Sequence, residues 1–117
     1  MIDAAGTHTI VIDQGSTFSM ALMVTDDDGY PYSLDTYTAK MQIRTGYADD
    51  GGTILADLAS GAGITRKDGW FIAAIPKTIT RTMPPGAWVW DFDITSPGGD
   101  TYTILRDSAL VRAETTR

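Results

Sequence analysis

Residues 87–95, AWVWDFDIT, alternate large apolar side chains with smaller or acidic ones. Successive side chains of a β-strand point to opposite faces, so a period of two predicts a strand with one face in a hydrophobic core. That face would consist of Trp88, Trp90, Phe92 and Ile94. We therefore expect this strand to fill the centre of the molecule. Replacing either tryptophan with alanine should then cost about 3 to 5 kcal/mol of stability.

Similar runs, separated by residues that favour turns, occupy the rest of the chain. Residues 37–44, YTAKMQIR, show the clearest alternation of apolar and polar side chains. Asp-Gly pairs at 28–29 and 68–69, and the SPGGD sequence at 96–100, have the chemistry of tight turns. The expected strands span residues 7–12, 16–25, 37–44, 53–59, 64–67, 70–75, 87–95 and 101–113.

Many short strands with little helix indicate an all-β fold. We expect residues 1–117 to form a single domain, an immunoglobulin-like antiparallel β-sandwich of about seven or eight strands, with a small barrel as the alternative. One short helical turn is expected near 76–83, and a kink in the last strand near Asp107-Ser108. Because the chain has no cysteine, packing alone must stabilise it. The expected structural core consists of Phe18, Leu22, Tyr37, Met41, Ile43, Trp88, Trp90 and Phe92.

The charge of the chain is concentrated in its first third. Residues 1–39 contain six aspartates and no lysine or arginine, whereas the remainder has nine acids and nine bases. Binding to nucleic acid depends on cations that displace counterions from phosphates, so we expect no direct nucleic-acid partner. The acidic third either aids solubility or meets a basic patch on a protein partner.

No apolar run approaches the about 18 to 20 residues that span a bilayer, and the N-terminus lacks a basic segment. We therefore expect a soluble, unprocessed protein with no membrane partner.

Residues that catalyse reactions or bind metals are sparse. The chain has one histidine, His8, and no cysteine, and its serines lie in no nucleophile-elbow pattern. Asp91 and Asp93 share a strand face and could in principle act as an acid and base. In an immunoglobulin-like sheet, however, they would lie opposite Lys40 and Arg44 as structural charge pairs. The DDDG run at 26–29 lacks the spacing of a calcium loop. We expect no enzyme activity, no catalytic or metal-binding residues and no cofactor.

Two segments predict contact with a partner. In the strand 70–75 both faces are apolar, although a sandwich strand normally exposes one face to water. Either residues 76–83 fold back over the second face or a neighbouring subunit covers it. The YPY tip at 30–32 presents tyrosines that suit an interface. The candidate contacts are Trp70, Phe71, Ile72, Tyr30 and Tyr32.

The order of the motifs resembles that of small structural proteins of tailed phages. The matching stretches are DQGSTF at 13–18, DDGYP at 27–31, LDTYTAKMQIR at 34–44, IP at 75–76, PGAWVWDF at 85–92 and SPGG at 96–99. Together they are similar to the immunoglobulin-like N-terminal module of phage baseplate upper proteins. The resemblance implies a non-catalytic structural or assembly component of a tailed bacteriophage particle, such as a tail, baseplate or adaptor protein.

The resemblance also implies that the chain is located in the virion, contacts other virion proteins and is present as a symmetric homo-oligomer. Baseplate upper proteins continue past this module, so we do not expect a complete fibre. Two alternatives remain: a capsid decoration protein, and a carbohydrate-binding sandwich with Tyr30, Tyr32, Tyr47 or Trp70 as a stacking platform.

Overall fold

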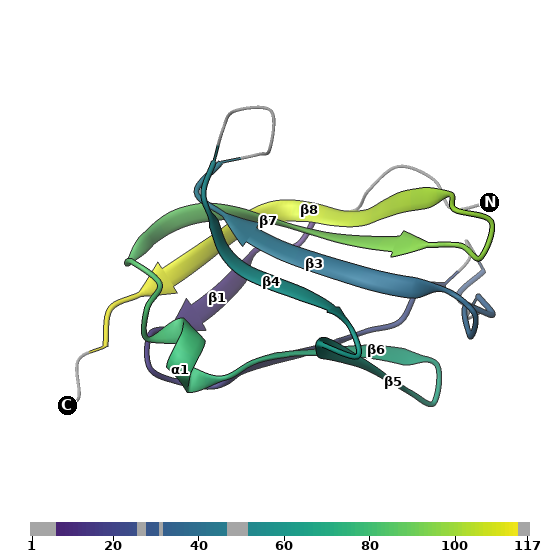
Figure 1. The fold of residues 1–117 in the computed structure, drawn as a ribbon, viewed down its shortest axis with the longest axis horizontal. Helices are drawn as coiled ribbons and strands as arrows, with labels where there is room; N and C mark the ends of the chain where they lie inside the picture. The colour runs from purple at the N-terminus through teal and green to yellow at the C-terminus, as the bar shows by residue number, and fades with distance from the viewer. Residues whose placement is uncertain (1–6, 26–27, 31, 47–51, 115–117) are drawn as a thin grey trace.

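The computed structural model of the chain describes residues 7–25, 28–30, 32–46 and 52–114, which form eight strands and one helical turn (Figure 1). Each expected strand is present, with ends shifted by no more than three residues. The elements are β1 (Ile10–Asp13), β2 (Phe18–Leu22), β3 (Thr38–Arg44), β4 (Ile54–Ser60), β5 (Gly63–Lys67), β6 (Trp70–Ile75), α1 (Lys77–Thr80), β7 (Gly86–Thr95) and β8 (Thr101–Arg112). The fold is therefore all-β, as the sequence predicts.

The eight strands form one mixed sheet that curls into a nearly barrel-shaped molecule. The strand order is β1-β8-β7-β3-β4-β5-β6-β2. Most neighbours are antiparallel, but β1 runs parallel to β8 and β4 runs parallel to β5. The expectation of an antiparallel sheet is wrong at these two places. Only Gly61 and Ala62 separate β4 from β5. After this corner the chain continues in the same direction, so the two strands pair in parallel.

That corner, at residues 60–63, folds the sheet back over itself. Among the described residues, β4 pairs with β5 only through Ala59 with Gly63 and Ser60 with Ile64. Gly63 has a φ of +99°, and a Cβ at this position would lie 2.9 Å from the Cδ2 atom of Leu58. A residue other than glycine would be strained there and would also clash with Leu58. The corner therefore positions β5, β6 and β2 opposite the other five strands.

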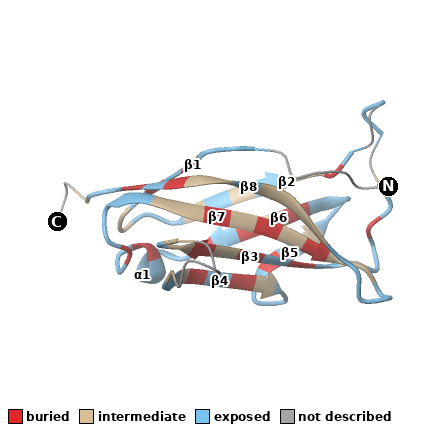
Figure 2. Cartoon of the chain, turned by 90° about the horizontal axis from the view of Figure 1, so that it is seen from above, coloured by how far each residue is buried: buried red, intermediate tan, exposed pale blue. Residues whose placement is uncertain are grey.

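The core lies between these two parts of the sheet. Buried positions recur along β3, β4, β6 and β7, whereas the connecting loops are mostly exposed (Figure 2). The rings of Phe71 on β6 and Phe92 on β7 pack edge to face, with centroids 5.7 Å apart. Of the expected core residues, Met41, Ile43, Trp90 and Phe92 are fully buried, while Phe18, Leu22, Tyr37 and Trp88 are half-buried and pack against them.

One turn and one bulge show how local backbone structure shapes the strands. Asp68 and Gly69 have φ values of 53° and 85°, so both central residues of the β5–β6 hairpin have positive φ, as in a type I′ turn. The expected kink near Asp107-Ser108 is displaced, because the register of β7 and β8 shifts between Phe92 and Asp93. Phe92 pairs with Leu105 and Asp93 with Thr103, which leaves Ile104 as the extra residue of a bulge.

The helical turn expected near 76–83 is present as α1, directly after Pro76. Its buried Thr80 hydroxyl donates a hydrogen bond to the Ser16 carbonyl (2.8 Å) and accepts one from the Gly15 N–H (3.2 Å). The Gln14 side-chain amide donates to the Met83 carbonyl at 3.0 Å. These bonds attach α1 to the β1–β2 connection, where the chain crosses from one part of the sheet to the other.

Trp90→Ala should lower the free energy of unfolding by about 3 to 5 kcal/mol, because it removes a fully buried indole and leaves a cavity. The Trp90 Nε1–H also donates to the His8 carbonyl at 2.9 Å. Trp88→Ala should cost less, since that indole is only half-buried. Urea denaturation of both variants measures the difference, and equal costs would contradict this placement of the two rings.

Thr80→Val should lower the free energy of unfolding by about 1 to 3 kcal/mol, because it leaves two polar backbone groups without their hydroxyl partner. Thr78→Val, at an exposed position of the same turn, is the matched control and should change stability little. Thermal denaturation compares the two variants. If Thr80→Val were as stable as its control, the hydroxyl would not fix the β1–β2 connection.

Candidate functional site

The outer face of β6 is apolar and exposed. Trp70 is 41% exposed, Ala74 is exposed, and Ile72 between them is half-buried. Ala21 of β2 lies beside Ile72 in the register of the sheet. We call Ala21, Trp70, Ile72 and Ala74 the β6 face. Thr65 and Lys67 of β5 border it opposite Ile72 and Trp70.

The structure places one of the predicted contact residues, Phe71, in the core. Phe71 is 1% exposed and packs against Phe92, so the expectation that it contacts a partner is wrong. Its side chain points inward because it alternates with Trp70 and Ile72 along the strand. One expected explanation for the second apolar face of strand 70–75 was that residues 76–83 cover it. They do not cover Trp70 on that face. Thr80 of this segment turns toward the β1–β2 connection, and Trp70 stays exposed.

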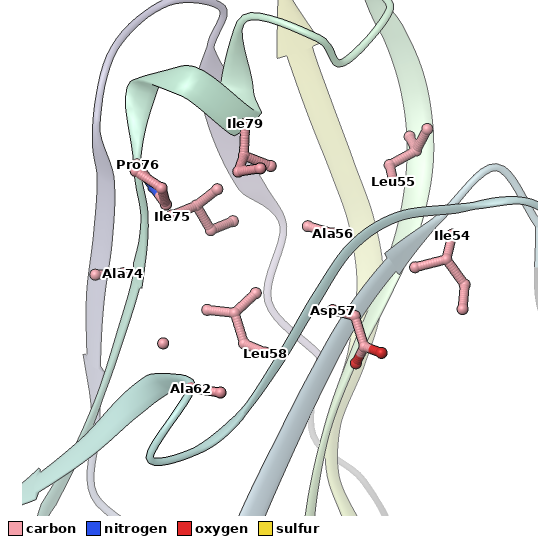
Figure 3. Close-up of a pocket in the computed structure, with 11 residues that line it drawn as sticks. Ile54, Leu55, Ala56, Asp57, Leu58, Ala62, Ala74, Ile75, Pro76 and Ile79 are labelled. Carbon is pink, nitrogen blue, oxygen red and sulfur yellow. The ribbon is translucent and has the colours of Figure 1, made fainter.

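An apolar groove separates β4 from the end of β6 and from α1. Away from the corner at 60–63, β4 diverges from β6. Within the described residues, residues 54–58 of β4 therefore pair with β3 and with no strand on the other side. The resulting groove has a volume of about 370 Å³, and Leu58, Ile75 and Ile79 point into it (Figure 3). We call it the β4 groove. It is lined by Ile54, Leu55, Ala56, Asp57, Leu58, Ala62, Gly63, Ala74, Ile75, Pro76 and Ile79.

The chemistry of the β4 groove is that of a hydrophobic contact rather than a catalytic site. Its one ionisable lining residue, Asp57, directs its carboxylate away from the space between the strands (Figure 3) and accepts a hydrogen bond from the Gln42 amide at 3.3 Å. Ile54 and Ile79 are 45% and 40% exposed. The groove meets the β6 face at Ala74. Sequence reasoning missed it because its lining comes from segments that are brought together only by the corner.

The tip at 30–32 is only partly an exposed surface. Tyr30 is 70% exposed, as expected for a contact residue. Tyr32 is half-buried, packs against the core, and its N–H donates to the Val24 carbonyl at 2.9 Å, so it is not a freely presented contact. Pro31, the aspartates at 26–27 and Tyr47 lie outside the described residues.

The Asp91–Asp93 pair lies on the outer face of the sheet, in a register that differs in part from the expected one. Lys40 is opposite Asp93, as predicted, but Arg44 is opposite Val89 and Asp91 is opposite Gln42. On its other side, Asp91 pairs with Arg106 of β8, a neighbour that sequence reasoning missed. The Arg44 guanidinium instead donates to the Gly52 carbonyl at 2.6 Å. The expectation that Arg44 lies directly opposite one of the two aspartates is therefore wrong.

Burial raises the pKa of Asp91, and the neighbouring Asp93 carboxylate raises it further. The cations of Arg106, Arg44 and Lys40 oppose this rise. Neither carboxylate lines the β4 groove. Within the ranges that the structure describes, no three His, Cys, Asp or Glu side chains gather in a way that could hold a metal ion. His8 is exposed, and its carbonyl accepts the Trp90 hydrogen bond.

No protein-family model matches this sequence, and no curated protein matches it either. Across the described part of the chain, no helix has the length and apolar character needed to cross a membrane.

Asp91→Asn should raise the melting temperature at pH 7, because the ionised carboxylate is disfavoured by burial and by Asp93. A raised folded-state pKa means that protonated Asp91 favours the fold below 3.8, its ordinary value, and that this stability is lost as the pH rises through the folded pKa. The gain should therefore shrink on acidification and disappear below about pH 3.8.

Asp68→Asn is the control for loss of one negative charge, since asparagine tolerates the positive φ of that exposed turn. Melting curves of both variants and the parent chain between pH 3 and pH 7 test the prediction. An Asp91→Asn variant that is less stable at pH 7 would mean that the three cations outweigh burial.

Proposed function

We propose that this chain is a non-catalytic structural subunit of a tailed bacteriophage particle, acting in the tail, in the baseplate or as an adaptor. In this proposal several copies assemble symmetrically with other virion proteins. The single observation that carries it is the pair of apolar surfaces, the β6 face and the β4 groove, that meet at Ala74 and are exposed in a single copy.

An exposed apolar surface of this kind is more typical of a protein that assembles with other subunits than of an independent monomer. Large apolar side chains that are exposed singly are ordinary, but contiguous ones mark sites where another surface excludes water. Ile54 and Ile79, each 40% exposed or more, line the β4 groove, and Trp70, 41% exposed, lies on the β6 face that meets the groove at Ala74. Burial of this region against another subunit would be favourable at about 25 cal/mol per Å² of apolar surface.

The strand order supports an immunoglobulin-like fold within the all-β class. In a variable-type immunoglobulin domain, strands B, E and D share one sheet, and strands G, F, C and C′ share the other. The orders β2-β6-β5 and β8-β7-β3-β4 correspond to these two sets. The buried Trp90 lies on β7, in the place of strand F, and packs without a disulfide because the chain has no cysteine. This fold agrees with the resemblance to the N-terminal module of baseplate upper proteins.

The charges on the outer sheet face also suit a structural role. Asp91 and Asp93 are half-buried between cationic or amide neighbours on a sheet surface, away from the β4 groove. Lys40 lies directly opposite Asp93, and a cross-strand charge pair of this kind contributes about 0.2 to 1 kcal/mol to a sheet. Asp93 therefore has a structural explanation that requires no substrate.

Mass spectrometry of purified particles of the phage that encodes the chain tests the proposal. We expect the protein at a stoichiometric copy number in intact particles, and a cryo-electron-microscopy map should place it in the tail or baseplate. Density on the capsid surface would support the capsid decoration alternative instead. Absence from purified particles, while the protein is present in the lysate, would overturn the structural role.

A second candidate, a carbohydrate-binding sandwich, is favoured by two exposed aromatic side chains. Tyr30 is 70% exposed, and Trp70, which directly follows the turn of the β5–β6 hairpin, is 41% exposed. A glycan array with the purified chain tests this function. Clear hits that Trp70→Ala abolishes, in a protein absent from particles, would select it over assembly.

A further inference from the structure

We propose that the open side of β4 binds an extended segment of a different protein, which adds a strand to the sheet beside residues 54–58. This segment has a lysine or arginine between two apolar residues. We call the backbone of residues 54–58, on the side away from β3, the β4 edge. The inference rests on the proposed role as an assembly subunit, and it adds where a partner docks and which residues that partner supplies.

The sheet lacks a strand beside the β4 edge. In the strand order β5 lies next to β4, but β5 begins only at Gly63, beside Ala59. The line of β5, continued back past Gly63, runs alongside residues 54–58. Within the described residues, the β4 groove of about 370 Å³ occupies that position instead of a strand. Pro76 and Ile79 border its far side, so the main chain that is open to a partner is that of β4 (Figure 3).

The backbone of Asp57 is directed toward this position. The Ala59 N–H donates to the Ala62 carbonyl at 2.9 Å, on the side away from β3. Backbone groups alternate between the two sides of an antiparallel strand, so Leu58 faces β3, and Asp57 faces the same side as Ala59. In the described part of the chain, no strand pairs with Asp57 on that side. An added strand would supply the hydrogen-bond partners that a neighbouring strand normally provides.

The side chains of β4 set the pattern of the added strand. Ala56 and Leu58 are buried on the inner face, whereas Asp57 between them is exposed on the outer face. Residues that lie opposite each other on adjacent strands share a face of the sheet. The residue beside Asp57 therefore points outward, and the residues before and after it point into the β4 groove. That groove is lined by Leu58, Ile75 and Ile79, so apolar side chains fit these two positions.

Asp57 favours a cation at the outward position. It is the one ionisable residue that lines the β4 groove, and its carboxylate accepts a hydrogen bond from the neutral Gln42 amide. The residue beyond Gln42 on the same face is another acid, Asp91. Opposite charges on adjacent strands stabilise a sheet, whereas like charges destabilise it. A lysine or arginine beside Asp57 is therefore favoured, and the net charge of −6 also favours a cationic partner.

A second copy of this chain does not supply such a segment. Residues 1–39 include both strands at the ends of the sheet, β1 and β2, and contain no lysine or arginine. Residues 113–117, AETTR, contain no large apolar side chain. A cation stands between two apolar residues only at Lys40 and Arg112, on β3 and β8, which already have a strand on each side. The segment therefore belongs to a different protein.

A synthetic peptide tests the proposal with the full chain. The probe is a fluorescein-labelled peptide of about nine residues, a usual strand length, in which valine alternates with lysine and threonine. We expect saturable binding by fluorescence anisotropy, about tenfold weaker when glutamate replaces the lysines. No saturable binding at up to about 1 mM peptide would overturn the proposal.

Methylation of the peptide nitrogens tests pairing through the main chain. In a strand the valine N–H groups point to one side and those of the other residues to the opposite side. Methylation of one of these two sets should abolish binding, and methylation of the other set should leave it nearly unchanged, because only one side faces the β4 edge. Equal affinities for the two methylated peptides would contradict strand addition.

Amide hydrogen exchange, followed by NMR, locates the added strand. In the free chain the Asp57 amide should exchange faster than the amides of Ala56 and Leu58, which face β3. Bound peptide should slow exchange of the Asp57 amide by about tenfold or more. A peptide that binds without slowing this amide occupies another site, and the inference is then wrong.

Variants of the chain test the charge and the groove separately. Asp57→Asn should weaken binding about fivefold, whereas Asp100→Asn, at an exposed turn, removes the same charge and should leave it unchanged. Ile79→Ser should also weaken binding about fivefold, because it removes apolar contact area. Leu110→Ser is its control, since Leu110 is 38% exposed and Ile79 is 40% exposed.

Ile54→Ser, on the other rim of the β4 groove, replaces Ile79→Ser if that variant does not fold by circular dichroism. Unchanged affinity in both Asp57→Asn and the folded rim variant would show that the peptide does not dock at the β4 edge.

A cryo-electron-microscopy map of particles separates this inference from the proposed function. A chain present in particles whose residues 54–58 have no neighbouring strand, or a strand from a second copy, overturns the inference and leaves the structural role intact. Peptide binding by the purified protein, together with its absence from particles, overturns the phage role and retains the β4 edge as a docking site.

Discussion

The contact between the two parts of the sheet depends on the corner at residues 60–63. A positive φ at Gly63 and the close approach of its backbone to Leu58 allow the chain to leave β4 and continue as β5 within two residues. Without that turn, Phe71 of β6 would not reach Phe92 of β7, and the apolar faces of both strands would be exposed to water. The position of the core is thus set by one glycine whose conformation other residues rarely adopt.

The same corner produces the exposed apolar surface. Because β4 and β5 pair over only two described residues, β4 and β6 diverge, and the space between them becomes the β4 groove. The hydrogen bonds of Thr80 hold α1 against the β1–β2 connection, so α1 narrows the groove with Ile79 without closing it. The packing between the two parts of the sheet and the open groove are therefore two consequences of one backbone feature.

The two faces of the larger part of the sheet differ in chemistry. Its inner face is formed by Met41, Ile43, Trp90 and Phe92, while its outer face carries Asp91 and Asp93 among cations and amides. The raised pKa of Asp91 reflects burial under neighbouring side chains and the nearby Asp93 carboxylate. A perturbed carboxyl group is often a sign of an active site, but a crowded sheet face perturbs it as well.

The sequence by itself determined the strands and the inward direction of Trp90 and Phe92, through the alternation of side chains, and the Asp68-Gly69 turn, through the chemistry of the Asp-Gly pair. These features are local, since they depend on the period of two in a strand and on the φ that a turn requires. Only the tertiary structure decided the parallel pairings, the Arg106 neighbour of Asp91, the burial of Phe71 and the β4 groove. Each of these depends on which segments meet in space. A strand with two apolar faces, such as 70–75, does not say which face turns inward, because that choice is made by the partner across the core.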